Sequence, residues 1–168
     1  YVLSTIAGTD QVVDCLPTVT VQNTADDGLG SLRRALVDVC SGGAVYFDPT
    51  LFSTPQTITV LSTLAMPNSM TLDGYTGGIA IPTISGNDAN RVFAVGANSP
   101  MTFTHVAVVN GLAPENGAGI HAPDTSPVWL IDVTLRDNRA LSVTTGTGSG
   151  GGAALLATHP HARITTPR

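Results

Sequence analysis

Charged side chains gather in one short segment toward the C-terminal end of the chain. Asp132 and Asp137 lie five positions apart, with Arg136 and Arg139 beside them. Paired carboxylates that flank one bond can hydrolyse a glycoside, and a tight acidic cluster can bind calcium. On a straight strand, however, residues five positions apart point to opposite faces. We therefore expect neither a catalytic pair nor a metal site in this segment.

Histidines and a glycine run are the other residues whose types could do chemistry. His159 and His161 offer only two ligands in a terminal segment, so we expect them to be solvated. His105 and His121 fall in related repeats and could stack on one face, although a satisfied or exposed histidine is the default. The glycine-rich run 146–152 resembles a phosphate loop, but no helix and no lysine follow it. A flexible insertion is therefore expected there.

Cys15 and Cys40 are the only cysteines, and they lie 40 − 15 = 25 residues apart. If the protein is secreted, they are expected to form a disulfide. Closing a loop of this length would stabilise the fold by roughly 3–4 kcal/mol in the chain-entropy model. Two buried free thiols are the alternative. A two-cysteine metal site is disfavoured, because no histidine lies near either cysteine in the sequence.

Composition limits the classes of partner and cofactor. The 168 residues suit one domain, and a hydrophobic content of 42% is enough for a core. All seven basic residues are arginine, so Schiff-base and P-loop chemistry are excluded and we expect no cofactor. A net charge of −5 without a basic cluster argues against nucleic acid as a partner. No apolar run approaches the roughly 20 residues of a transmembrane segment.

A short strand-like phrase recurs along the chain and leads each time toward a glycine-rich phrase. Its copies begin at Met70, Met101 and Val128. Recurrence at about 20 to 50 residues is the signature of a solenoid, whose units bury their apolar faces only by stacking. The 18 glycines and 11 prolines between short Val, Ile and Thr runs also indicate strands and turns.

Asparagine marks a similar place in each repeat. Asn87, Asn110 and Asn138 are separated by 110 − 87 = 23 and 138 − 110 = 28 residues. Coils of that length suit a parallel β-helix, in which equivalent positions stack about 4.8 Å apart, so these side chains are expected to form an asparagine ladder. Three ordinary turns in an antiparallel protein are the alternative. Against it stands the scarcity of two-residue hairpin signals.

One amphipathic helix is expected at about residues 31–40. Ser31 can cap its N-terminus, and Gly42 or Gly43 can end it. Asp26 and Asp27 are expected to support the preceding turn or the helix N-terminus. The apolar stripe of the helix consists of Leu32, Ala35, Leu36 and Val39. Such a helix can cover the open end of a stack, which otherwise exposes apolar side chains and unpaired backbone groups.

The chain is expected to have three parts. An N-terminal extension strand occupies 1–17, with an apolar run from Tyr1 to Ala7, the β-helix occupies 18–157, and an irregular tail occupies 158–168. Trp129, the only tryptophan, lies in an apolar run and is expected to pack in the core rather than to stack on a sugar. The other expected interior side chains are Leu72, Phe93, Phe103, Val106, Val108, Ile120, Leu130, Val133, Leu135 and Leu155.

Five segments resemble a large family of bacterial secreted proteins: 18–36, 45–52, 56–60, 70–74 and 84–87. The first of them reads Thr-Val-Thr-Val-Gln-Asn-Thr-Ala-Asp-Asp-Gly-Leu-Gly-Ser-Leu-Arg-Arg-Ala-Leu. The family is that of the right-handed parallel β-helix proteins of the adhesin-like, polymorphic-outer-membrane-protein and choice-of-anchor type. The resemblance implies an all-β, right-handed parallel β-helix with a short N-terminal capping helix.

The resemblance covers about residues 18–157 and is most specific in 28–47, which is similar to the N-terminal cap of the family. It implies an exported protein, extracellular or at the cell surface, usually without an assigned reaction. The departure lies at the C-terminal end. Relatives typically continue through many more coils and an anchoring region, whereas this sequence stops after a short tail.

A stack without an evident C-terminal cap leaves its last rung exposed. We expect the tail at 162–166, a continuation of the chain or the next copy of the protein to cover it. Head-to-tail contacts that do not close into a ring generate a filament. The strand at 1–7 could then pair with an exposed edge of a neighbour.

The expected function is a non-catalytic structural or adhesive module outside the cell. Its expected partners are further copies of itself and surface glycans or the surface of a host or neighbouring cell. The alternative is a carbohydrate-active enzyme, since parallel β-helices also host pectin-degrading lyases and hydrolases. Calcium-dependent release of unsaturated sugar from polygalacturonate would favour the enzyme, whereas inertness toward a polysaccharide panel would favour the structural role.

Overall fold

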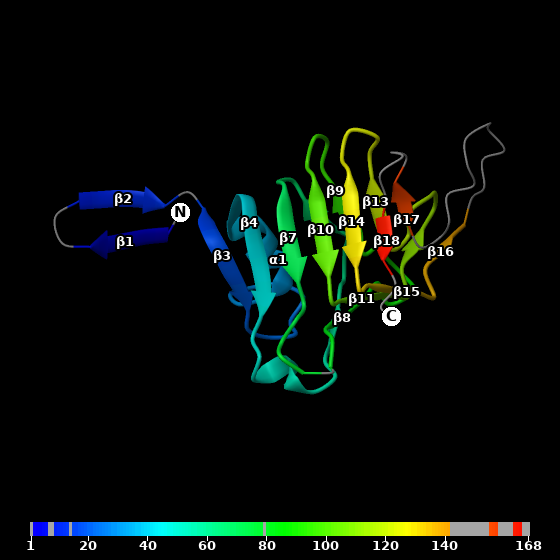
Figure 1. The fold of residues 1–168 in the computed structure, drawn as a ribbon, viewed down its shortest axis with the longest axis horizontal. Coiled ribbons are helices and arrows are strands. Elements are labelled where there is room, and N and C mark those ends of the chain that lie inside the picture. Colours follow the sequence, from blue (N-terminus) through cyan, green and yellow to red (C-terminus); the bar gives the residue numbers. More distant parts are fainter. Residues whose placement is uncertain are drawn as a thin grey trace.

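The strands stack in parallel into a β-solenoid of about five turns, shown in Figure 1. The computed structural model describes residues 2–6, 9–13, 15–78, 80–141, 155–157 and 163–165. Three parallel sheets of four to six strands run along the stack, and each coil after the first passes through them in turn. The predicted all-β class and parallel β-helix are confirmed.

The three sheets are named in the order in which each coil visits them. The first sheet contains β3 (Leu16–Val21), β4 (Val39–Phe47), β7 (Met70–Asp73), β10 (Met101–Thr104), β14 (Val128–Ile131) and β18 (Arg163–Thr165). The second contains β5 (Thr57–Thr59), β8 (Thr83–Ser85), β11 (Ala107–Val109) and β15 (Thr134–Arg136). The third contains β6 (Leu64–Met66), β9 (Phe93–Val95), β13 (Ile120–Ala122) and β17 (Leu155–Ala157). Between the second and third sheets, β12 (Leu112–Ala113) pairs with β16 (Arg139–Ala140).

The repeated strand phrases stack in register. Leu72 pairs with Phe103 and Phe103 with Leu130, and all three point into the interior, where their apolar side chains are removed from water. Most predicted core residues are buried: Leu72, Phe93, Phe103, Val106, Val108, Ile120 and Leu130. Val133 and Leu135 are partly buried against the same core. The side chain of Leu155 lies outside those that the structure describes.

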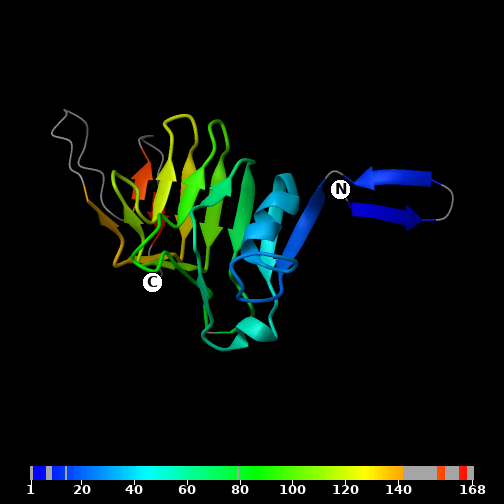
Figure 2. The ribbon, with the colours of Figure 1, turned by 180° about the vertical axis from the view of Figure 1, so that it is seen from behind.

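The predicted capping helix is α1 (Leu32–Asp38), which takes the place of strands in the first coil. Seen from behind in Figure 2, it lies beside β3 and β4 at the N-terminal end of the stack. The hydroxyl oxygen of Ser31 accepts a hydrogen bond from the backbone N–H of Arg34 and donates to the Gly28 carbonyl, as an N-cap does. The whole predicted stripe is buried: Leu32, Ala35, Leu36 and Val39.

The predicted helix end at Gly42 or Gly43 is wrong. The helix ends at Asp38, and Val39 already has an extended backbone and begins β4. Gly42, at φ 80°, lies inside that strand, where its N–H donates to the carbonyl of Ser69. Pairing with the next coil therefore ends the helix earlier than a glycine C-cap would.

The predicted asparagine ladder is also wrong, because Asn110 lies one position away from the column that Asn87 and Asn138 share with Gly111. Val109 pairs with Ser85 and with Arg136, so true coil lengths here are 109 − 85 = 24 and 136 − 109 = 27 residues. The asparagines stand 23 and 28 residues apart and miss a common column by one position. Among the hydrogen bonds of the described residues, none joins two of these side chains.

Asn138 instead binds the backbone of the preceding coil. Its Oδ1 accepts from the N–H of Gly111 at 2.8 Å, and its Nδ2 donates to the carbonyl of Val108 at 2.9 Å. Asn87 and Asn110 supply left-handed corners, with φ of 56° and 51°, a conformation that asparagine tolerates better than most residues. The bonds therefore tie one coil to its neighbour without an amide column.

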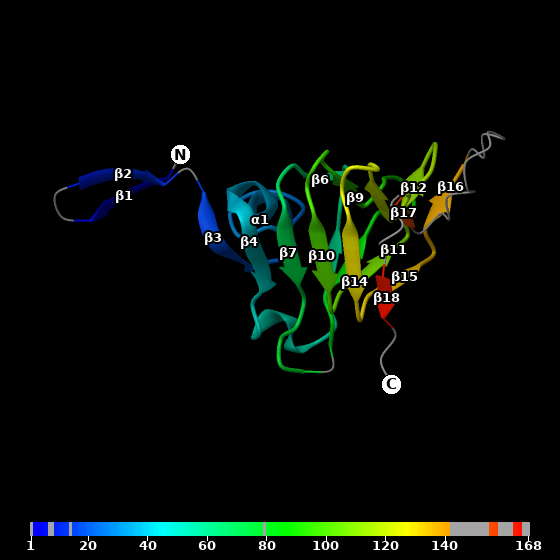
Figure 3. The same cartoon turned by 45° about the horizontal axis from the view of Figure 1, so that its top comes forward.

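Both ends of the chain differ from the prediction. The N-terminal extension contains two strands, β1 (Val2–Ile6) and β2 (Thr9–Val13), which form an antiparallel hairpin. The hairpin projects from the N-terminal end of the stack in Figures 1 and 3. In the tail that was expected to be irregular, β18 pairs in parallel with β14 and continues the first sheet. The solenoid therefore begins at Leu16 and extends to Thr165.

The described helices are short. Besides α1, the described residues form a single 3-10 turn, at Leu51–Ser53. No helix in the described part of the chain has the length and apolar character needed to cross a membrane.

Candidate functional site

The outer surface of the first sheet is a regular array of side chains, which we call the threonine face. Strand alternation sends every second residue of β3, β4, β7, β10 and β14 outward. The pairing of these strands aligns the outward residues in two rows. One row contains Thr18, Ala44, Thr71, Thr102 and Trp129. The other contains Thr20, Tyr46, Asp73, Thr104 and Ile131.

Trp129 belongs to this face and not to the core, so the prediction of core packing is wrong. Its side chain pairs in register with Thr102, and the residue is 36% exposed. Tyr46, in the other row, is 41% exposed. Every residue of β14 is apolar, so alternation within that strand could not show which residues face outward. Aligning the repeated strand phrases places Trp129 with Thr71 and Thr102, and this is the sequence signal that could have shown that Trp129 faces outward.

A histidine lies between two carboxylates at the corner where the first sheet turns into the second. Thr104 Oγ1 is 2.7 Å from His105 Nδ1, and Asp73 Oδ1 is 3.4 Å from the same nitrogen. On the other side of the ring, Asp132 Oδ2 is 3.6 Å from Nε2. The ring of Tyr75 packs against the imidazole, with 5.1 Å between the ring centres. We call these residues the His105 corner.

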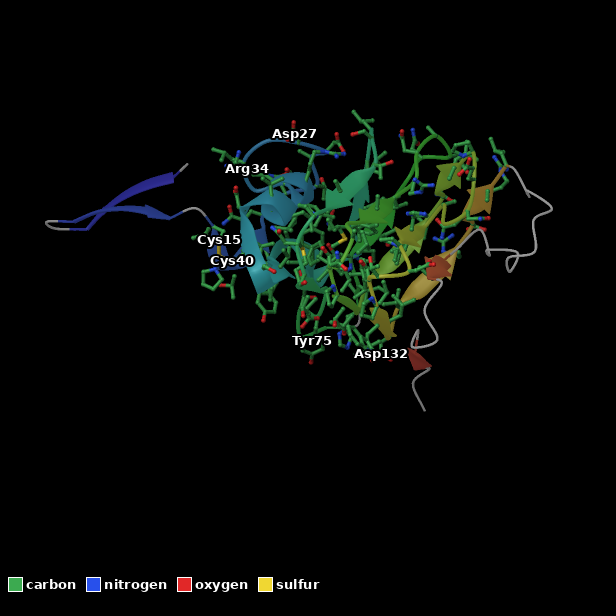
Figure 4. The ribbon with its side chains drawn as sticks, turned by 90° about the horizontal axis from the view of Figure 1, so that it is seen from above. Cys15, Asp27, Arg34, Cys40, Tyr75 and Asp132 are labelled. Carbon is green, nitrogen blue, oxygen red and sulfur yellow. A yellow bond between two sulfur atoms is a disulfide. The ribbon has the colours of Figure 1, made fainter. Side chains whose placement is uncertain are left out.

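Stacking explains how the His105 corner is assembled. Thr104 pairs with Asp73 and with Ile131, so His105 follows in the column of Gly74 and Asp132. At Gly74 there is no room for a side chain without a shift of the backbone, since a Cβ there would run into the carbonyl of His105. Figure 4 shows Tyr75 and Asp132 on the same side of the solenoid.

The chemistry open to the His105 corner is proton transfer and ligand binding. The side chains of His105, Asp73 and Asp132 are 32%, 27% and 38% exposed, so a ligand can reach them. An imidazole beside carboxylates can accept and return a proton, and a protonated ring would pair with either aspartate. The described residues include no group of three His, Cys, Asp or Glu side chains with the spacing of a metal site.

The charged segment noted in the sequence does not form one site. Asp132 belongs to the His105 corner, whereas Asp137 pairs with Arg136 at 2.8 Å on the exposed surface. Arg139 lies in β16, after the next corner. Asp132 and Asp137 thus face different surroundings, as expected from their spacing.

Of the acids before α1, Asp27 supports the turn as predicted, whereas Asp26 makes other contacts. Asp26 pairs with Arg33 at 2.7 Å and also accepts from the N–H of Leu61, so it links the helix to the next coil. Asp27 accepts from the N–H of Gly28 within the turn.

His121 does not stack with His105, so that possibility is wrong. It lies in β13 of the third sheet, whereas His105 follows β10 of the first. Burial, and next the nearby charge of Arg91, lower the pKa of His121 below its usual value, while Glu115 acts in the opposite direction. His159, His161 and the glycine run 146–152 lie outside the described residues.

A disulfide joins Cys15 to Cys40, as predicted for a secreted chain, with their Cα atoms 4.9 Å apart. It connects the residue before β3 to the second residue of β4 at the N-terminal end of the stack, as Figure 4 shows. Beside it, a groove of about 310 Å³ lies between β3 and α1. Leu16, Thr20 and Leu29 are part of its lining.

No family model, curated protein or solved structure matches this chain. Resemblance to the secreted β-helix family, which comes from the sequence segments alone, therefore stays a prediction.

Proposed function

We propose that the protein is a non-catalytic structural or adhesive β-solenoid module that acts outside the cell and associates end to end. One observation carries the proposal: the same parallel sheet ends in β3 on one side and in β18 on the other, each with a single neighbouring strand among the described residues. A second copy placed head to tail can therefore continue this sheet in the same strand direction. Such a contact is heterologous and can repeat.

The shape of the N-terminal end limits where a second copy can bind. Helix α1 covers the interior of the first coil and packs against β6, so the cores of two copies cannot stack continuously. The free edge of β3 and the groove beside it remain accessible, with Leu29 as the most exposed large apolar side chain. Pro17 has no N–H to donate, which confines pairing mainly to the rest of the strand.

The disulfide supports a role outside the cytoplasm. Disulfides persist in oxidising compartments and are rare where thiol reductants are maintained. Here the bond fastens β3 to β4 at the end proposed to receive a second copy. In an extracellular assembly, the disulfide would hold the edge strand β3, with which a second copy would pair, against β4.

The hairpin is the second element of the proposed contact. Its strand Val2–Ile6 is already paired on one edge with Thr9–Val13, so only its other edge can add to a neighbour. We therefore expect addition of a two-stranded hairpin, not of a single strand as the sequence suggested.

The test is sedimentation velocity and negative-stain microscopy over a range of protein concentrations, with the full chain and a variant that lacks residues 1–13 but keeps Cys15. Filaments of the full chain and shorter assemblies of the variant are expected. Assembly of both forms would support pairing of the sheet edges without the hairpin. Monomers of both forms at high concentration would contradict end-to-end association.

A second candidate, a carbohydrate-active enzyme, is favoured by the His105 corner. His105 lies between Asp73 and Asp132 beside the exposed ring of Tyr75, which is a suitable surrounding for proton transfer to a sugar oxygen. New reducing ends or unsaturated products from a polysaccharide panel, lost in the Asp132→Asn variant, would support this candidate. Inertness of the native protein across the panel would leave the structural role.

A further inference from the structure

The threonine face combines free hydroxyls with exposed aromatic rings on one parallel sheet. Among the described residues, the hydroxyls of Thr18, Thr71 and Thr102 take part in no intramolecular hydrogen bond, and neither do the polar atoms of Tyr46 and Trp129. An aromatic ring binds the C–H face of a sugar, while hydroxyls exchange hydrogen bonds with sugar hydroxyls. The face therefore has the chemistry of a carbohydrate platform.

The regular spacing of the face suits a polymer better than a single sugar. Its rows advance by about 4.8 Å from one strand to the next. This is close to the advance of one residue along an extended β-1,4-linked chain. Tyr46 and Trp129 lie on β4 and β14, three strand steps or about 14 Å apart along the stack, and they belong to the two different rows, so a ligand that contacts both crosses from one row to the other. One ligand that contacts both rings must therefore span several sugar residues.

The charge of the threonine face distinguishes between neutral and anionic polysaccharides. None of the strands β3, β4, β7, β10 and β14 contains lysine or arginine. The only basic residue in the described strands of this sheet is Arg163 of β18, which pairs in register with Trp129 at the C-terminal end of the face. The face carries the carboxylate of Asp73, and Asp132 lies at its border in the His105 corner. In a protein whose net charge is −5, these carboxylates oppose a uronic acid polymer along β7 to β14, whereas a neutral chain meets no such repulsion.

We propose that the threonine face binds an extended, uncharged β-1,4-linked glycan that lies along the solenoid axis, with Tyr46 and Trp129 as its aromatic contacts. This inference rests on the adhesive part of the proposed function and names the class of ligand. It does not depend on end-to-end association, because the face lies on the side of the stack and is complete in one copy.

The test is a fluorescence titration of the full, disulfide-bonded chain at a concentration where sedimentation shows monomers. Trp129 is the only tryptophan, so its emission reports on this face alone. Cellohexaose and chitohexaose are the probes, with cellobiose and chitobiose as short ligands and oligogalacturonate as the anionic one. We expect a saturable blue shift with a hexasaccharide, binding of the disaccharide at least about tenfold weaker, and no saturable change with oligogalacturonate.

Variants locate the ligand on the face. Tyr46→Ala, followed through Trp129 emission, should weaken hexasaccharide binding about tenfold, and Thr102→Val should weaken it by a smaller factor. Leu61→Ala is the matched control, since Leu61 is 70% exposed and lies outside the face. Its affinity should equal that of the native chain. Equal losses in Tyr46→Ala and Leu61→Ala would overturn the assignment.

The remaining outcomes are also decisive. Binding of only one hexasaccharide supports the proposal and identifies the sugar. No emission change with either hexasaccharide overturns it, as does preferential binding of oligogalacturonate. A blue shift of Trp129 emission that grows with protein concentration in the absence of sugar also overturns the proposal, because a second copy of the protein then covers the face. If the protein stays monomeric and binds a hexasaccharide, end-to-end association is contradicted and glycan binding is supported. If the protein forms filaments and binds neither hexasaccharide, only glycan binding is contradicted.

Discussion

The imidazole of His105 and the carboxylate of Asp132 come within 3.6 Å of each other across the step between two successive coils. Both residues adopt the left-handed conformation, each with φ of 53°. The corner thus repeats the same unusual backbone geometry in adjacent coils and places the two side chains at equivalent outward positions. Side chains that are distant in the sequence become neighbours whenever their coils share a corner.

The backbone at His105 can be tested separately from its side-chain contacts. His105→Asn and His105→Val both remove the imidazole, but only asparagine tolerates a left-handed corner well. We expect His105→Val to lower the free energy of unfolding by about 1–3 kcal/mol more than His105→Asn, because a β-branched residue is strained at positive φ. Urea unfolding measures the difference. Equal stability of the two variants would show that the corner relaxes.

Asn138 provides the clearest test of how neighbouring coils are fastened. Asn138→Ala leaves the N–H of Gly111 and the carbonyl of Val108 without their present partner, inside the protein where water cannot replace it. We expect a loss of about 2–4 kcal/mol in the free energy of unfolding. Asn68→Ala is the control, since the Asn68 side chain makes no hydrogen bond in the described structure, and its change should stay within about 0.5 kcal/mol. Similar losses in both variants would contradict the assigned role.

Much of the fold is predictable from the sequence because the strand phrases alternate between inward and outward residues. The sequence predicts that Leu72, Phe103 and Leu130 are interior residues, and in the structure they stack in one buried column. The asparagine ladder failed for a simple reason: coil length includes corners and insertions, so a recurring residue need not return to the same column. An error of one position changes which backbone group the side chain meets, as Asn138 shows.

The candidate site was less predictable than the fold. Asp73 and Asp132 approach His105 only because three coils are stacked in register. No local sequence pattern indicates that these three residues are close. Only an alignment of successive coils at the corner could have predicted their proximity. A buried serine pair illustrates a signal that was present: Ser99 and Ser126 each precede a proline at the same corner, and the N–H of Ser99 donates to Ser126 Oγ.

His121 should make stability depend on pH in a defined direction. Its pKa is lowered in the folded protein, first by burial and then by Arg91, so protons bind more readily to the unfolded chain. Its neutral form therefore contributes stability that is fully present above the unfolded pKa of about 6.5 and is lost as the pH falls through the lower folded value.

His121→Gln removes this titration and keeps a polar side chain of similar length. Melting temperatures of the native chain and the variant are compared between pH 8 and pH 5, so that changes shared by both cancel. We expect the native chain to lose stability relative to the variant as the pH falls below about 6.5. A constant difference across this range would show that His121 has no linked effect.

Removal of the disulfide tests both the stability of the N-terminal end and the proposed environment of the protein. In the Cys15→Ser/Cys40→Ser variant, the free energy of unfolding should fall by about 3–4 kcal/mol, because the unfolded chain regains the freedom of a 25-residue loop. Urea unfolding of the variant and of the oxidised native chain measures this loss. The local effect should appear in hydrogen exchange as faster exchange of the amides of β3, while those of β10, which lies between β7 and β14, change less.

The same experiment separates the disulfide from the alternative of two free thiols. Alkylation of the native chain without a reductant should modify neither cysteine, since both are joined in the bond. If both cysteines were alkylated after isolation from the oxidising compartment, the bond would be absent and would no longer support a role outside the cytoplasm. If the bond is present but its removal leaves β3 protected, pairing with β4 and packing against α1 are sufficient to hold the edge strand. The edge strand would then remain available for end-to-end association even under reducing conditions.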